Sequence, residues 1–365
     1  MHVRSAERTE RAPFVACARA VHVVPAQGFP PGALLPLAAV PSIRSIRPLG
    51  LIVLAAVVLQ ACGGPTQVAT RHATAHPKPA LKSVAATTLG TLPAAVQDAA
   101  VAPLGEGRLA LLGGIDSAQT STDAIVTLGA GGATPDPGTL PVPQHDAQAA
   151  KLGADVYVFG GGQVASYDHI VRYDPASGTT ATVGSLPTPA SDVAVTSIGD
   201  TAYIVGGYTG AGWLDTILAW RPGSTARVVG HLPVGLRYAA VAVAGRRIII
   251  AGGTEPSSVS DQILSFDPAS GVVSPLGRLP SPVTHASAVF LDGRVVLVGG
   301  RAQADGGQTA AVLAINPATG AVTTVGRLPQ PLSDAAVALD GGRIIVAGGD
   351  DGNGPQSSIL ALIPR

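Results

Sequence analysis

The sequence predicts an all-β protein that folds as a six-bladed β-propeller with four-stranded blades. Two dipeptide markers repeat six times with the same period, and each period holds four short apolar segments separated by turns. Hydrophobic residues make up 46% of the chain and charged residues 13%, with 46 Gly and 31 Pro. This composition is typical of many short strands joined by tight turns.

The two markers are a Leu-Pro pair and a Gly-Gly pair that follows it. The Leu-Pro pairs begin at Leu92, Leu140, Leu186, Leu232, Leu279 and Leu328, and the Gly-Gly pairs at Gly113, Gly161, Gly206, Gly252, Gly299 and Gly348. A fixed period that holds for six copies indicates a repeat architecture, and four strands in ~47 residues match one propeller blade.

The copy that begins at Leu279 illustrates the strands within one period. In order, we expect a strand at 286–291, an Asp292-Gly293 turn, a strand at 294–298, a strand near 312–315, a turn at 316–320 and a strand at 321–325. Asp-Gly and Pro-containing turns reverse a chain within a few residues. The second strand of each period is almost continuously apolar, which indicates that neighbouring blades cover both of its faces.

The two ends of the chain predict how the ring closes. The sixth copy stops after its third strand, at 358–362, whereas 83–90 match the fourth strand of other copies, such as 179–184. We therefore expect the N-terminal strand to complete the last blade, which removes the two free sheet edges that an open ring would leave.

The N-terminal region has the pattern expected of a secretion signal. An uncharged apolar run at 49–59 follows Arg44 and Arg47; eleven residues are too few to span a bilayer, which takes ~20, but suit a signal peptide. The run ends in Leu-Gln-Ala-Cys62, which resembles the bacterial lipobox and implies lipidation of Cys62. The alternatives are an ordinary signal peptide or a buried apolar strand.

These features divide the chain into three parts. Residues 1–61 are expected to be a leader and lipoprotein signal peptide, 62–80 a flexible tether and 81–365 the propeller. The leader is so long that we expect translation to begin nearer Val40. The expected location is extracytoplasmic, with a lipid anchor in the bacterial cell membrane and a monomeric propeller.

Charge and cysteine content exclude several classes of function. Residues 1–61 hold six Arg and two Glu, so the rest of the chain carries 17 basic and 21 acidic side chains, a net charge of −4. A duplex-binding protein needs a basic patch, so we expect no nucleic-acid partner. Cys17 and Cys62 both precede the repeats, so the repeats contain no disulfide or cysteine ligand.

The repeats resemble those of the kelch family. Tyr-Asp-Pro-Ala-Ser-Gly at 173–178 follows a third strand, with weaker copies at 266–271 and 315–320. The resemblance covers about 82–365 and implies a kelch-type propeller like the central domain of galactose oxidase. The Trp that the family usually carries is replaced, by Thr180, Arg227, Val273 and Val322. The copper and cysteine–tyrosine cofactor of galactose oxidase cannot form without a cysteine, and no cofactor or metal is expected.

The resemblance leaves three functions open. The leading hypothesis is a tethered binding or scaffold protein that recognises a carbohydrate or a protein. The second is a small-molecule enzyme, such as a sugar epimerase or the sialic acid mutarotases of the kelch type, and the third is a structural envelope component. We expect ligand contacts from the loops that differ between copies: His145, Trp213, Arg237, Tyr238, His285 and Arg301.

One polar position recurs six residues after each Leu of the Leu-Pro pair. It holds Asp98, Asp146, Asp192, Tyr238, His285 and Asp334. The four aspartates could form a cation or sugar site at the mouth of a central channel, or each could cap backbone amides in its own blade. Because a residue repeated in equivalent blades usually serves the repeat, capping is the favoured interpretation.

Overall fold

The computed structural model describes residues 80–302 and 306–365. The expected leader, Cys62 and residues 62–79 of the expected tether lie outside the described residues. All regular elements in the described part are β-strands, and it contains no helix long and apolar enough to cross a membrane.

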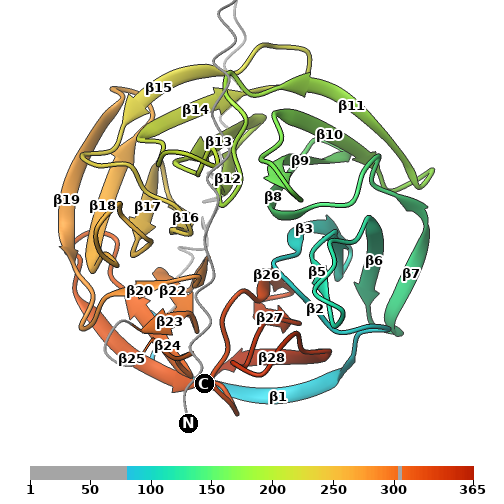
Figure 1. Cartoon of the computed structure of the whole chain (residues 1–365). Helices are drawn as coiled ribbons and strands as arrows, with labels where there is room; N and C mark the ends of the chain where they lie inside the picture. The colour runs from blue at the N-terminus through green and yellow to red at the C-terminus, as the bar shows by residue number, and fades with distance from the viewer. Residues whose placement is uncertain (1–79, 303–305) are drawn as a thin grey trace, which may run out of the picture. The chain divides into compact units, whose positions relative to one another are not determined.

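Six four-stranded antiparallel sheets stand around one axis (Figure 1). Blade 1 contains β3 (Ala100–Gly105), β4 (Arg108–Leu112), β6 (Ala124–Gly129) and β7 (Gly132–Thr139). Blade 2 contains β8 (His145–Leu152), β9 (Asp155–Gly162), β10 (His169–Asp174) and β11 (Thr179–Ser185). Blade 3 contains β12 (Ala194–Ile198), β13 (Thr201–Val205), β14 (Thr216–Trp220) and β15 (Arg227–His231).

The other three blades follow the same plan, innermost strand first. Blade 4 contains β16 (Ala240–Ala244), β17 (Arg247–Ala251), β18 (Gln262–Asp267) and β19 (Val272–Arg278). Blade 5 contains β21 (Ser287–Leu291), β22 (Arg294–Val298), β24 (Ala311–Ile315) and β25 (Val322–Arg327). Blade 6 contains β26 (Ala336–Asp340), β27 (Arg343–Ala347), β28 (Ser358–Pro364) and β1 (Val84–Thr91). In blade 5 the expected strand ends agree with these bounds to within two residues.

The predicted ring closure is confirmed. Strand β1 pairs antiparallel with β28, from Val84 opposite Pro364 to Thr91 opposite Ser358. In Figure 1 the cyan β1 lies beside the red β28. The first described strand thus supplies the outer edge of the last blade.

The core lies between neighbouring blades. Val296 and Val312 of blade 5, for example, pack with Ile344 and Leu360 of blade 6, and all four are buried. Second and third strands are therefore covered on both faces, as their apolar sequences predict.

The Gly-Gly pairs join each blade to the next. The N–H of the second Gly donates a hydrogen bond of 2.8–2.9 Å to the carbonyl of the segment that enters the next blade. In blade 2 the pair that makes this contact is Gly160-Gly161, one residue before the pair counted in the sequence. A Cβ on the first Gly would overlap that same carbonyl oxygen, and this Gly has a φ of 61–69° in all six pairs. The six bonds are Gly114 to Gln144, Gly161 to Ala190, Gly207 to Leu236, Gly253 to Val283, Gly300 to Leu332 and Gly349 to Val96.

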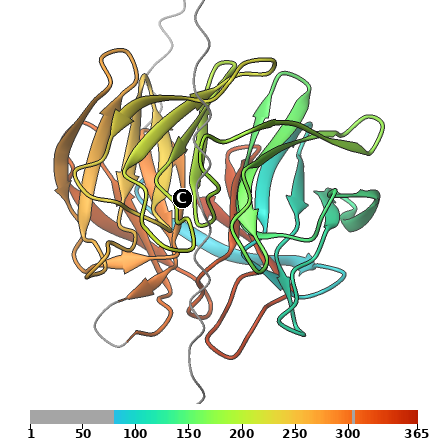
Figure 2. The ribbon, with the colours of Figure 1, turned by 45° about the horizontal axis from the view of Figure 1, so that its top comes forward.

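Two sets of connections lie at the same end of the propeller. The segment before a first strand pairs with the segment after Gly-Gly: β2 (Val96–Gln97) with β5 (Ile115–Asp116), and β20 (Val283–Thr284) with β23 (Arg301–Ala302). In Figure 2 the loops after β27 (red) and β22 (orange) project from the same end. We call this end the loop face.

Candidate functional site

Six residues form a closed ring on the loop face, at the mouth of the central channel. We call them the mouth ring: Asp98, Asp146, Asp192, Tyr238, His285 and Asp334. Each has a left-handed backbone with φ between 53° and 59°. Each backbone N–H donates to the carbonyl of the ring residue one blade earlier, and the six distances are 2.9–3.3 Å. This geometry turns the six side chains toward the axis.

The expectation that each aspartate caps amides of its own blade is wrong. In the described part of the chain, none of the four carboxylates accepts a hydrogen bond from a backbone amide. They accept from side chains instead: Asp98 from Gln97 (3.0 Å), Asp146 from Tyr238 (3.1 Å), Asp192 from Arg237 (3.0 Å), and Asp334 from Ser333 (2.6 Å) and Arg301 (2.5 Å). The ring serves the repeat through its backbone, because Asp tolerates the left-handed conformation, and this leaves its side chains free to face the channel.

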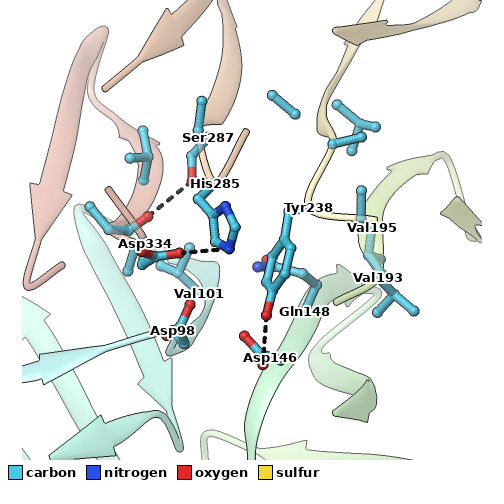
Figure 3. Close-up of a pocket in the computed structure, with 18 of the residues that line it drawn as sticks. Asp98, Val101, Asp146, Gln148, Val193, Val195, Tyr238, His285, Ser287 and Asp334 are labelled. Atoms are coloured by element: carbon cyan, nitrogen blue, oxygen red, sulfur yellow. Dashed lines mark hydrogen bonds and ion pairs between the residues drawn. The ribbon is translucent and has the colours of Figure 1, made fainter. Parts of the chain in front are cut away.

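The mouth ring lines a cavity of about 130 Å³. Ala and Val side chains of the first strands form its walls, and Gln148 and Ser287 add polar groups deeper in the channel. Figure 3 shows the carboxyls of Asp98 and Asp146 on one side of this cavity, and the rings of Tyr238 and His285 beside each other. The aspartates come from blades 6, 1, 2 and 3, so one arc of the mouth is acidic and the other aromatic.

Two of the four carboxylates have an arginine partner. Arg237 Nη1 lies 3.0 Å from Asp192 Oδ2, whose side chain is 4% exposed. Arg301 Nη2 lies 2.5 Å from Asp334 Oδ2, whose side chain is 1% exposed, and 3.6 Å from Asp350 Oδ2. Burial strengthens such pairs, since water screens them little.

The other two carboxyls, Asp98 and Asp146, have no arginine or lysine partner among the described residues. Burial raises both pKa values well above the ordinary value. Neighbouring carboxylates raise the two pKa values further: Asp334 and Asp146 act on Asp98, and Asp192 and Asp334 on Asp146. Like charges in one buried site disfavour ionisation, so each of these carboxyls holds its proton to a higher pH than a solvated aspartate.

The aromatic arc is tightly packed. The rings of Tyr238 and His285 stack with their centroids 3.7 Å apart. Burial lowers the pKa of His285 to about 4, although Asp334 opposes this, so its imidazole is neutral at pH 7. Burial and the charge of Asp146 raise the pKa of Tyr238, and its hydroxyl stays protonated as the donor to Asp146.

The structure brings Trp213, Arg237 and Tyr238 together. The Arg237 guanidinium lies 4.8 Å from the ring centroid of Tyr208, 5.4 Å from that of Trp213 and 5.3 Å from that of Tyr238. The expected cluster of aromatics and a cation therefore exists. These rings pack on the guanidinium and hold it against Asp192, so Arg237 is not a free cation for a ligand carboxylate.

The remaining expected residues also lie at the mouth. His145 Nδ1 is 2.8 Å from Ser121 Oγ and its Nε2 is 3.5 Å from Asp146 Oδ2. Burial lowers the pKa of His145, with Asp192 opposing the shift. Arg301 orients Asp334 and Ser333. Of the six expected residues, Tyr238 and His285 thus belong to the mouth ring, and the other four lie around it.

Sequence reasoning placed the four aspartates in register but left them out of the expected contact residues. The signal that could have pointed to them is their recurrence at one position of the repeat in four of the six copies. Gln97, Gln148 and Ser333 were missed because nothing in the repeat marks them. Within the described residues, no group of three or more His, Cys, Asp or Glu is placed to hold a metal ion.

Comparisons with known proteins agree with the geometry of the fold. The family model of the KLHDC2/KLHL20/DRC7 Kelch-repeats domain matches residues 133–300. A solved structure described as the structure of YjhT has a TM-score of 0.67 at 16% identity, over 76% of this chain and 97% of that one. At this identity the likeness shows the fold alone. The sequence comparison with curated proteins gives no match. Six repeats and six closed blades make this chain a six-bladed β-propeller, and its residues 133–300 match a kelch-repeat family model.

Proposed function

We propose that the protein is an extracytoplasmic binding module that takes one end of a carbohydrate into the mouth ring. The observation that carries the proposal is the cavity itself, in which carboxyls from four blades face a stacked tyrosine and histidine. Loops held by a rigid scaffold commonly carry function, and here the ring of backbone hydrogen bonds fixes all six side chains.

The size and polarity of the mouth favour a sugar over a protein surface. Its volume of about 130 Å³ is well below the ~300 Å³ at which pockets for drug-sized ligands begin. Only a few atoms of a ligand can enter, and carboxyls and amides suit hydroxyl groups. The large exposed hydrophobic side chains of the described residues are scattered over outer strands and loops: Leu89, Val142, Val164, Val183, Val228, Val272 and Ile363. None of them lines the mouth cavity.

The binding experiment is a glycan screen with the purified protein and two variants. Asp146→Asn should weaken binding of any hit by about tenfold or more, since a charged or strongly polar contact is worth ~1.5–3 kcal/mol. Ser270→Ala changes an exposed turn between β18 and β19 at the opposite end and should leave affinity unchanged. Equal affinities of the wild-type protein and Asp146→Asn would place the site elsewhere.

The proposed tether rests on the lipobox-like sequence that ends at Cys62. Replacing Cys62 by Ser should move the protein from the membrane fraction to the soluble fraction without lowering its melting temperature. Recovery of Cys62→Ser in the membrane fraction would contradict a lipid anchor at this residue.

A second candidate function is a sugar mutarotase or epimerase, which the raised pKa values of Asp98 and Asp146 favour. In mutarotation, a protonated carboxyl gives its proton to the ring oxygen while a carboxylate takes the proton of the anomeric hydroxyl. The bond between the anomeric carbon and the ring oxygen breaks, a carbonyl forms, and closure on either face reverses both transfers. Acid–base catalysis of this kind needs only two positioned groups.

The enzyme candidate is tested by anomer interconversion. Freshly dissolved reducing sugars are followed by NMR with the wild-type protein, Asp98→Asn and Asp146→Asn. The enzyme would be established if the wild-type protein accelerates anomer interconversion and either variant lowers that acceleration by ~10²-fold or more. Equal rates with and without the wild-type protein would leave binding as the function.

A further inference from the structure

The charges at the channel mouth are unbalanced. The titratable and charged groups that face the mouth ring are its four aspartates with Tyr238 and His285, and around them His145, Arg237, Arg301 and Asp350. Arg237 and Arg301 balance Asp192 and Asp334, whereas burial keeps the two histidines neutral at pH 7. Asp98 and Asp146 remain without a positive partner in the described chain. When both ionise, the mouth carries excess negative charge that only protons or a ligand can neutralise.

A second, independent observation is an unused hydrogen-bond acceptor. The side chain of Asp146 is 11% exposed, and its Oδ1 atom is fully buried with no hydrogen-bond partner. The Nδ1 atom of His285, across the same cavity, is also buried and unpaired. Leaving a buried polar atom unpaired costs ~1–3 kcal/mol. Both atoms would be satisfied by a ligand that brings several donors into the mouth.

We propose that the ligand carries a protonated primary amine and that this amine enters the acidic arc of the mouth ring between Asp98 and Asp146. The inference rests on the proposed function and narrows its ligand to an amino sugar. An ammonium group brings one positive charge and three N–H donors, which match the missing charge and the unpaired acceptor. A neutral sugar supplies donors but leaves the carboxylates uncompensated. A cavity of about 130 Å³ holds the amine and its adjoining atoms, while the rest of the sugar lies above the mouth.

The proposal predicts a particular pH dependence. At low pH Asp98 and Asp146 are protonated, and the amine has to displace a proton to bind. Affinity therefore rises as the pH approaches the raised pKa values of these carboxyls, by up to tenfold per pH unit for each displaced proton. It falls again when the amine of the ligand loses its own proton. A neutral sugar would show no rise of this kind.

The test is isothermal titration calorimetry of the purified protein at pH 5.5 and 7.5. The probes are glucosamine, N-acetylglucosamine, glucose and putrescine. We expect glucosamine to bind at least tenfold more tightly than N-acetylglucosamine and glucose at pH 7.5, and more tightly at pH 7.5 than at pH 5.5. Asp98→Asn and Asp146→Asn should each lose at least tenfold in glucosamine affinity. Asp200→Asn removes an exposed carboxylate from the turn between β12 and β13 and should bind like the wild type.

The outcomes separate this inference from the proposed function. If glucose, N-acetylglucosamine and glucosamine bind equally tightly and Asp146→Asn loses this binding, the requirement for an amine is overturned. A sugar site at the mouth is then retained. If putrescine binds and glucosamine does not, the recognition of an amine is retained and the assignment of a sugar ligand is overturned. No binding of either amine, or equal loss of affinity in Asp200→Asn, overturns the inference. Melting curves of the variants exclude unfolding as the cause of any loss.

Discussion

The backbone and the side chain of each mouth-ring residue meet different demands. The left-handed backbone, which closes the ring of hydrogen bonds, explains the recurrence of Asp, because Asp, Asn and His tolerate this conformation best. Tyr238 adopts it too, with a φ of 53°, although bulky residues rarely do. Strained positions of this kind often mark functional sites. The left-handed backbone alone explains neither the presence of Tyr at position 238 nor the lack of a cationic partner for Asp98 and Asp146 among the described residues.

The unpaired carboxyls should lower the stability of the protein at neutral pH. The folded pKa of Asp98 lies above its unfolded value, so its contribution to stability is fully present below the unfolded pKa and is lost as the pH rises through the folded pKa. Asp98→Asn removes the ionisable carboxyl and therefore removes this loss of stability at higher pH. We expect a melting temperature higher than that of the wild type by ~2 °C or more at pH 7.5, with the difference shrinking toward pH 4.

The same substitution at Asp192 is the matched control and should act in the opposite direction. Asp192 is paired with Arg237, and Asn would leave the guanidinium without its anion. Differential scanning calorimetry at both pH values measures both effects. A melting temperature that falls equally in Asp98→Asn and Asp192→Asn at pH 7.5 would contradict the charge imbalance.

At the scale of the elements, the Gly-Gly pairs serve contacts between blades as well as turns within them. The first Gly of each pair has a positive φ, which marks a tight bend in the chain. The sequence could not show that the partner is a carbonyl of the next blade, because that contact joins residues about 30 positions apart at five junctions and near opposite ends of the propeller sequence at the sixth, from Gly349 to Val96. Repeat stability therefore includes a backbone hydrogen bond at every blade junction.

Replacing one of these glycines tests the junction. In Gly299→Ala the added Cβ would overlap the carbonyl oxygen of Leu332, whereas in Gly293→Ala it would meet open space. Both positions have positive φ, so both variants carry the ~1–2 kcal/mol cost of a left-handed alanine. Gly299→Ala should lose a further ~1–3 kcal/mol of unfolding free energy from the overlap, measured by urea denaturation. Equal losses in the two variants would show that the close approach does not matter.

Strand β1 closes the ring, and two of its residues offer a paired test. Val84 is 8% exposed and packs in the core between blades 5 and 6, whereas Leu89 on the same strand is 46% exposed. Val84→Asp buries an unpaired charge and should lower the unfolding free energy by ~3 kcal/mol or more, with aggregation through the freed edge of β28. Leu89→Asp should cost less than ~1 kcal/mol. Full stability of Val84→Asp would mean that β1 is dispensable for closure.

At the scale of the whole molecule, the repeat made the fold predictable and the site only partly so. Leu-Pro and Gly-Gly spacings fixed six blades, and the missing fourth strand of the last copy fixed the closure by β1. The variable loops from which ligand contacts were expected lie at the end that carries the mouth ring. The direction of the aspartate side chains could not be predicted, because Asp at a repeated position is compatible with local capping and with a ring around the axis. The left-handed backbone decides between them, and no sequence pattern revealed it.

The pairing of the arginines was likewise beyond the sequence. Arg237 and Arg301 stand in the variable loops, where a free cation for an anionic ligand is the natural expectation. Each lies instead against a carboxylate contributed by a neighbouring blade, a contact between positions that the repeat does not relate. The mouth is consequently acidic rather than basic, which changes the class of ligand that it suits.

The most direct test of the central claim is a crystal structure of the protein with the carbohydrate that the glycan screen selects. We expect difference density for the ligand within the mouth ring, with at least one ligand donor within hydrogen-bond distance of Asp146 Oδ1. Ligand density at the other end of the channel, or on the outer strands with the mouth ring unchanged, would contradict this claim.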